Sequence, residues 1–238
     1  MHWDSAMQTH RGNRRENNED AVLSRPDVCL WAVADGMGGH HAGDVASQAV
    51  ADALGELSFC GELANDVDAV EDALVTVNEE LRLLARTEGV GNTIGSTVVA
   101  MLASEHVGVA LWAGDSRLYR LRGSRLEQVT RDHNPVSDLL ESGTVSEADA
   151  LAADTNIITR AVGGQAELYL DVAVFDVEPG DTYLLCSDGL YRELAAPELV
   201  AALRCGDVHA SVGTLLEQCL EGSARDNVSI VVARPKLQ

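Results

Sequence analysis

Two dipeptides place an aspartate and a glycine directly after an apolar run that is short enough to form a buried strand. Asp35-Gly36 follows residues 28–34, and Asp188-Gly189 closely follows residues 182–186. An aspartate carboxylate beside a glycine carbonyl offers two oxygen ligands on rigid backbone, and Mg²⁺ and Mn²⁺ prefer oxygen ligands. A lone Asp-Gly is more often an ordinary turn, so the metal interpretation depends on other acids joining it.

Further carboxylates lie beside Gly, Asn or Ser, or next to an apolar run, where a rigid scaffold can aim them: Glu19, Asp20, Asp115 and Asp226. Several carboxylates in one cleft repel one another strongly unless divalent cations neutralise them. If these acids converge, a metal centre is the economical explanation. Two adjacent arginines, Arg14 and Arg15, precede the first of these acids, and either could hold a phosphate group.

Helical patterns occur on both sides of a strand-rich middle. Apolar residues recur at helical spacing over 41–57, and again with the spacing 3-4-3-4-3 over 67–84, where Gly89 closes the second helix. Their short connection predicts an antiparallel helix pair on one side of a sheet. Two later helices are predicted, one from about Pro197 to Leu203 and one over 208–220.

Apolar and β-branched runs predict three hairpins, which are 97–102 with 107–113, 118–121 with 126–129, and 171–177 with 182–186, followed by a last strand at 228–233. Hairpins in series indicate antiparallel sheet and exclude a doubly wound parallel fold. Residues 4–12 are expected to be a short lead-in.

The region 132–163 interrupts the succession of predicted strands. It is rich in Asp, Glu, Ser and Asn and has one short helical piece around 136–140, so a surface insertion or lid is expected. No repeat or linker divides the chain, and a single domain over 1–238 is therefore predicted.

The composition narrows the possible partners. With 17 basic and 38 acidic side chains the formal charge is −21, which argues against nucleic acid or an anionic membrane surface. No stretch reaches the roughly 18 apolar residues that span a bilayer, and no signal peptide pattern opens the chain. Five cysteines without a C-x-x-C pair are expected to be buried thiols in a cytoplasmic protein.

Six motifs in a fixed order resemble those of the PP2C-type (PPM) protein Ser/Thr phosphatases in their bacterial form. They are Arg15-Glu16-Asn17-Asn18-Glu19-Asp20, Asp35-Gly36-Met37-Gly38-Gly39, Gly95-Ser96-Thr97, Gly114-Asp115-Ser116-Arg117, Ser187-Asp188-Gly189 and Arg225-Asp226-Asn227. The series extends over about residues 8–233. A single motif would be weak evidence, whereas six in register over nearly the whole chain are strong evidence.

The resemblance implies an α+β fold, a four-layer αββα sandwich with two antiparallel sheets flanked by antiparallel helix pairs. It also implies a two-ion Mn²⁺ or Mg²⁺ centre. On this model the ligands are Asp35, which bridges both ions, Asp188 and Asp226 on one ion, and Glu19 and the Gly36 carbonyl on the other. Asp20 would support these ligands without itself binding an ion.

The same resemblance implies the chemistry. A water held by both ions becomes the nucleophile, and Arg15 holds the phosphate because it lies four residues before Glu19, as the family's phosphate-binding arginine does. Asp115 with Asp188 resembles the pair that holds a third, weaker ion in bacterial members.

One position departs from the family's eukaryotic members. They carry a histidine, a proposed proton donor, directly after the Asp-Gly, whereas this chain has Met37. His40 and His41 are close in sequence but not at that position, and either is a candidate for the acid. A water on the ions is the other candidate. Residues 132–163 resemble the family's flap, whose expected role is substrate choice.

These observations predict a metal-dependent protein serine/threonine phosphatase. The expected substrates are phosphoserine and phosphothreonine residues of proteins, so the enzyme would reverse the action of a Ser/Thr kinase. The protein is expected to be a monomer.

Two alternatives remain open. Gly114-Asp115-Ser116-Arg117 resembles the opening block of GDSL-type ester hydrolases, with Ser116 as nucleophile, although it lies mid-chain between antiparallel strands. The other alternative is a phosphoprotein-binding module without turnover.

Overall fold

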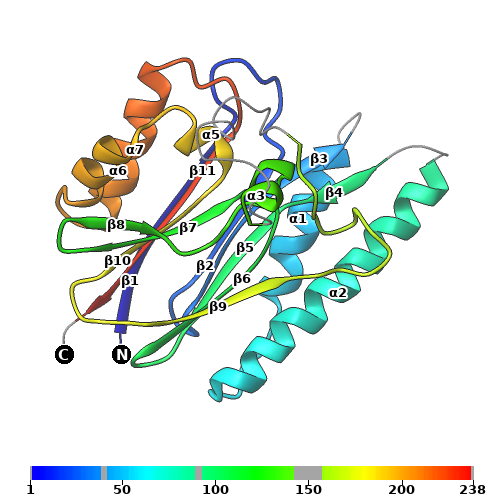
Figure 1. The fold of residues 1–238 in the computed structure, drawn as a ribbon, viewed down its shortest axis with the longest axis horizontal. Helices are drawn as coiled ribbons and strands as arrows, with labels where there is room; N and C mark the ends of the chain where they lie inside the picture. The colour runs from blue at the N-terminus through cyan, green and yellow to red at the C-terminus, as the bar shows by residue number, and fades with distance from the viewer. Residues whose placement is uncertain (1, 39–41, 89–92, 142–156, 237–238) are drawn as a thin grey trace.

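Strands from both ends of the chain share the first of two antiparallel sheets in the computed structural model, which describes residues 2–38, 42–88, 93–141 and 157–236 (Figure 1). The sheet has the order β1-β11-β10-β7-β8, formed by β1 (His2–His10), β11 (Val228–Lys236), β10 (Thr182–Cys186), β7 (Arg117–Arg122) and β8 (Arg125–Gln128). All neighbours in it are antiparallel.

The second sheet has the order β2-β3-β5-β6-β9. Its strands are β2 (Asp20–Arg25), β3 (Leu30–Gly38), β5 (Val98–Ala103), β6 (Val107–Ala113) and β9 (Asp171–Asp176), and the short β4 (Ile94–Ser96) pairs with the end of β3. The predicted hairpins β5–β6 and β7–β8 are confirmed, one in each sheet.

Aromatic side chains fill the space between the two sheets. Trp3 of β1 packs against Trp31 of β3 and Tyr183 of β10, with its ring centroid 4.8 Å from that of Trp31 and 5.8 Å from that of Tyr183. All three are at most 2 % exposed. Burying such large side chains supplies much of the free energy that holds the sheets together.

A helix pair covers the outer face of each sheet. Helices α1 (Ala42–Gly55) and α2 (Leu63–Glu88) pack on the second sheet, and α6 (Ala196–Leu203) and α7 (Val208–Glu221) pack on the first. Shorter helices, α3 (Pro135–Glu141) and α5 (Asp188–Tyr191), lie outside these layers (Figure 1). The four-layer αββα arrangement is confirmed. Among the described helices, none combines the length and apolarity that crossing a membrane requires.

The third predicted hairpin is wrong, because β9 and β10 belong to different sheets. The connection between them crosses the sandwich, and Arg122 holds it by ion pairs to Asp176 at 2.6 Å and Asp181 at 2.8 Å. Residue periodicity finds each strand but contains no information about which sheet it joins. The region 142–156, the centre of the predicted insertion, lies outside the described residues.

Three smaller expectations are also corrected. The expected lead-in contains β1, whose nine residues pair with β11, a partner too distant in sequence to predict. Strand β3 does not end at Asp35 but continues to Gly38 along β4. The cysteines are not all buried, because Cys60 and Cys205 are exposed.

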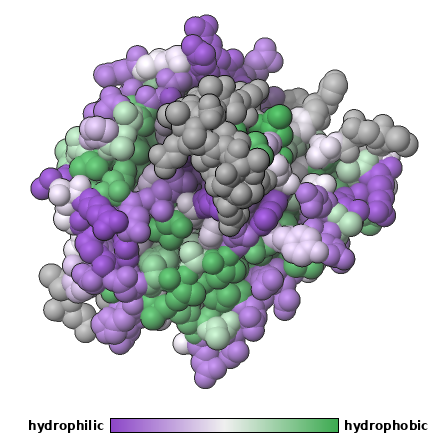
Figure 2. Space-filling view, in the orientation of Figure 1, coloured by the Kyte–Doolittle hydropathy of each residue, from purple (hydrophilic) through white to green (hydrophobic). Residues whose placement is uncertain are grey.

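The outer face of the edge strand β9 lacks the helix cover that its neighbours have. Val172 and Val174 are 51 % and 70 % exposed. Figure 2 shows an apolar area on the face of the molecule where Figure 1 places β6 and β9. Ala173 and Phe175, which alternate with them, face the inner core instead.

Candidate metal centre

One end of the sandwich gathers acids from elements far apart in sequence. The register of β2 and β3 places Asp20 opposite Asp35. Ser187, the residue before Asp188, donates a hydrogen bond of 2.8 Å from Oγ to Asp20 Oδ2. This contact joins the second sheet to the end of β10 in the first. The two Asp-Gly dipeptides therefore lie at the same end of the molecule.

The loop before β2 is fastened to the loop before β11. Asn227 Oδ1 accepts a hydrogen bond of 2.8 Å from the Glu19 backbone N–H, and Asn227 Nδ2 donates to the carbonyls of Arg11 and Asn17. In the same region Arg15 Nη2 is 2.7 Å from Asp226 Oδ2. The side chain of Asn227 thus brings the predicted phosphate-binding arginine to a predicted metal ligand.

The position of Asp35 is fixed through its backbone. Its N–H donates to Thr97 Oγ1 at 3.0 Å, and its carbonyl accepts from the Thr97 N–H at 2.8 Å. Thr97 Oγ1 in turn shares a hydrogen bond of 2.8 Å with Ser116 Oγ, and Ser116 is 1 % exposed. Ser116 therefore supports Asp35 structurally, which argues against its use as the nucleophile of an ester hydrolase.

Glycines allow the predicted ligands to approach one another. A Cβ on Gly43, in the first turn of α1, would lie 3.0 Å from both Glu19 Cδ and the Gly36 carbonyl oxygen. These are the two groups expected to share an ion, and both can lie close to Gly43 because it has no side chain. Gly189 has a similar role, because its Cβ would lie 2.0 Å from the Asn227 carbonyl oxygen.

Burial and mutual repulsion act on the grouped carboxyls. Burial raises the pKa of Asp35 well above its usual range, and the charges of Asp20, Asp188, Asp115 and Asp226 raise it further. Burial is also the largest cause that raises the pKa of Asp20 to about 7 and of Asp115 to about 6. Acids that resist ionisation in this way mark a place where a cation would be strongly stabilising.

The residues present fit a pair of hard cations. Among the described residues, the buried oxygens Asp20 Oδ1, Asp115 Oδ1 and Asp188 Oδ1 have no hydrogen-bond partner. The donor set is all oxygen, as Mg²⁺ and Mn²⁺ prefer. Within the described ranges, no group of three or more Asp, Glu, His or Cys side chains is already arranged to hold a metal ion. Guanidinium groups contact three of the acids instead: Arg15 contacts Asp226, and Arg192 contacts Asp115 and Asp188.

Most of the predicted site residues are brought together by these contacts: Arg15, Glu19, Asp20, Asp35, Gly36, Asp188 and Asp226. Asp115 joins the group through Arg192, which contacts both Asp115 and Asp188. His40 and His41, the alternative acids, lie outside the described residues.

Sequence reasoning missed two residues of the site, Arg192 and Gly43. Arg192 follows Asp188 by four residues, and this spacing becomes informative only once residues 188–191 are known to be helical. Gly43 lies just beyond the glycine-rich motif, and only the packing shows that Glu19 approaches it.

A double sheet between helix pairs, with an all-oxygen acid cluster and an arginine at one end, defines the class of metal-dependent phosphatases of this fold. The chain belongs to the protein phosphatase 2C family, whose model matches residues 7–227. It is 37 % identical over 231 residues to the serine/threonine protein phosphatase PstP of Mycobacterium tuberculosis. That match covers 96 % of this chain and 44 % of the relative, so the chain spans less than half of PstP.

Solved structures show the same fold. PppA, described as a key regulatory component of T6SS in Pseudomonas aeruginosa, has a TM-score of 0.90 and 41 % identity, with 98 % of each chain covered. The catalytic domain of PstP in complex with two manganese ions has a TM-score of 0.84 and 35 % identity, covering 98 % of this chain and 97 % of that one.

The raised carboxyl pKa values predict how the metal-free protein responds to pH. Asp20 and Asp115 bind protons more tightly when folded than when unfolded, so folding loses stability as pH rises from about 4 to about 7. In chelator, the urea midpoint should therefore be lower at about pH 8 than at about pH 5.

Asp20→Asn is the matched variant for that comparison, because it removes one of the titrating groups and should reduce the difference between the two midpoints. Added Mn²⁺ should raise the midpoint at the higher pH. A midpoint that rises with pH in chelator would contradict the proposed crowding of acids.

Proposed function

We propose that this chain hydrolyses phosphoserine and phosphothreonine esters of proteins with two Mn²⁺ or Mg²⁺ ions. The observation that carries the proposal is the meeting of Asp20, Asp35, Asp188 and Asp226 with Arg15 at one end of the sandwich. Membership of the protein phosphatase 2C family supports it. So does the manganese-containing catalytic domain of the related PstP.

Asp35, Asp188 and Asp226 would hold one ion, and Asp35, Glu19 and the Gly36 carbonyl would hold the other. When bound, the ions supply an acidified water for attack on phosphorus. Asp20 accepts the Ser187 hydroxyl and is 8 % exposed, so it supports the neighbouring ligands rather than meeting substrate.

Arg15 would hold the phosphate. Its side chain is 51 % exposed while it contacts Asp226, so it can reach solvent and the site at once. A guanidinium offers parallel donors to two phosphate oxygens and offsets the charge of the transition state. Met37 has no transferable proton, so the proton for the departing serine or threonine oxygen has to come from another group, such as water at the site or His40 or His41.

The proposal extends to the whole chain. Residues 1–238 act as a single phosphatase domain, in the cytoplasm and as a monomer. The substrates are phosphoproteins that include a Ser/Thr kinase or its targets.

The region 132–163 serves as a flap for substrate choice. Its two ends are tied to β9, because His133 lies 3.2 Å and Arg160 lies 2.6 Å from Asp171.

Phosphate release from a phosphothreonine peptide tests the function. We expect turnover with Mn²⁺, loss to background on adding chelator, and recovery when excess Mn²⁺ is restored. Turnover that survives chelator would contradict the mechanism. Peptide binding without phosphate release would instead identify a binding module, and hydrolysis of a simple carboxylic ester abolished by Ser116→Ala would identify an ester hydrolase.

A further inference from the structure

A guanidinium nitrogen lies between the two acids that were expected to share a third ion. Arg192 Nη2 is 3.1 Å from Asp188 Oδ2 and 3.4 Å from Asp115 Oδ2. One nitrogen therefore contacts an oxygen of each carboxylate. The Asp115 and Asp188 side chains are only 3 % and 12 % exposed, so this charge contact is poorly screened by water.

A divalent cation and this guanidinium cannot occupy the same place. An ion bonded to both carboxylates would lie about 2.0–2.6 Å from an oxygen of each. The Arg192 nitrogen is already in contact with the Oδ2 atom of each carboxylate, and it has the same sign of charge as the ion. The guanidinium therefore takes the place that a third ion between Asp115 Oδ2 and Asp188 Oδ2 would need.

The surrounding contacts hold the arginine and Asp115 in this arrangement. Arg192 directly follows α5, the four-residue helix that begins at Asp188, and its N–H donates to the Asp188 carbonyl at 3.0 Å. Tyr191 donates from its hydroxyl to the Asp115 carbonyl at 3.1 Å, and the Arg117 guanidinium lies 3.5 Å above the Tyr191 ring. Two consecutive residues thus fix the backbone and the carboxylate of Asp115.

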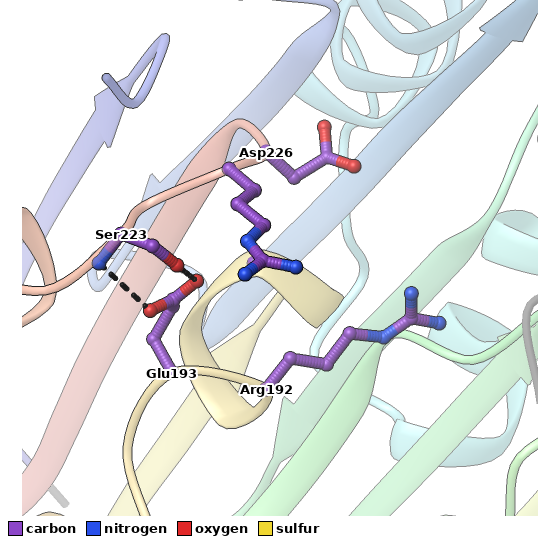
Figure 3. A pocket seen from close by; sticks show the side chains of 6 residues that line it. Arg192, Glu193, Ser223 and Asp226 are labelled. Carbon is purple, nitrogen blue, oxygen red and sulfur yellow. Dashed lines mark hydrogen bonds between the residues drawn. The ribbon is translucent and has the colours of Figure 1, made fainter. Parts of the chain in front are cut away.

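The arginine also forms part of the wall of a cavity beside the centre. The cavity has a volume of about 520 Å³ and is lined by Gly189, Arg192, Glu193, Ser223, Arg225 and Asp226. In Figure 3 Arg192 and Asp226 lie along this wall, while Glu193 is held by two hydrogen bonds to Ser223. The charge of Arg192 therefore lies next to the proposed ligand Asp188 and lines the same cavity as the proposed ligand Asp226.

We infer that Arg192 is a positioning residue that replaces a third metal ion: its guanidinium neutralises Asp115, orients Asp188, and leaves the chain with two ion sites. The inference rests on the proposed function, because Asp188 is positioned for one of its two ions. The replacement has a physical consequence. A covalently attached cation is not lost on dilution or to a chelator, so this part of the site keeps its charge at any metal concentration.

Counting bound Mn²⁺ by equilibrium dialysis with electron paramagnetic resonance tests this role without measuring activity. We expect two ions per chain for the wild type and for Arg192→Lys, which keeps a cation. Arg192→Ala should gain a third, weaker site, and adding Asp115→Asn to it should remove that site. Asp115→Asn alone should leave the count at two, which tests the inference without any change at Arg192.

Arg225→Ala is the matched control, because it removes an arginine from the same cavity and should still bind two ions. Thermal unfolding in chelator checks that every variant is folded. A wild type that binds three ions, one of them lost in Asp115→Asn, would overturn the role of Arg192 alone. An Arg192→Ala variant that stays at two ions would do the same. A wild type that binds none would overturn the two-ion centre as well.

Discussion

Asp35→Asn is expected to lower kcat/KM for a phosphothreonine peptide at least about a thousandfold, since removing a single preorganised electrostatic contact already costs about 10²–10³. Asp35 is the residue proposed to bridge both ions, and an amide cannot supply the second anionic oxygen that a bridge needs. Its carboxylate also lies near four other acids, and the bound ions would neutralise the charge of this whole group. Steady-state kinetics at saturating Mn²⁺ measure the loss.

A second measurement separates this effect from misfolding. Burial raises the pKa of Asp35, so the carboxylate is costly in the metal-free fold and Asn should not lower the unfolding temperature in chelator. The stabilisation that Mn²⁺ gives the wild type should instead be lost. Asp68→Asn, at an exposed position of α2, is the matched control and should leave both readouts unchanged. Near wild-type activity in Asp35→Asn would reject the mechanism.

Gly36→Ala is expected to reduce the free energy of unfolding by about 3 kcal/mol, at the upper end of the usual cost of overpacking. A Cβ at this position would lie 2.0 Å from the Gly43 carbonyl oxygen and 2.5 Å from the Glu19 carbonyl oxygen. Both are backbone atoms, so no side-chain rotation relieves the clash. The start of α1 must move away from β3, which also displaces the Gly36 carbonyl proposed as an ion ligand.

Urea unfolding in chelator measures this loss, and dialysis measures the accompanying fall in Mn²⁺ affinity. Gly213→Ala is the matched control. Apart from its chain neighbours and the nearby backbone of α7, no described atom lies within 4 Å of its Cβ position, so alanine should stabilise that helix by up to about 1 kcal/mol. Equal stability of Gly36→Ala and the wild type would show that β3 and α1 are not packed as described.

Much of the fold could be predicted from local sequence patterns, because helices and hairpins form between residues that are close together in the chain. The 3-4-3-4-3 spacing predicted α2, and the apolar runs predicted β5–β6 and β7–β8. The expected role of Asp35 came from its place after a buried run, and the six ordered motifs predicted the family, which is confirmed.

Which strands join which sheet depends on pairing between distant segments, and local patterns contain no information about it. Strand β1 pairs with β11 across the whole chain length, and β9 and β10 separate into different sheets although a short turn joins them. The same limit applied to the site. Sequence could name Asp35, Asp188 and Asp226 but could not bring them together.

The sequence by itself determined the types of chemical group at the site, because oxygen ligands and a phosphate-binding arginine are properties of single residues in order. Only the tertiary structure decided what each acid contacts. Asp115 and Asp188 resemble a pair of ion ligands, and the fold shows that the Arg192 guanidinium contacts both of them. The physical reason is that a charge contact depends on a separation of a few ångströms in space, which the distance along the chain does not determine.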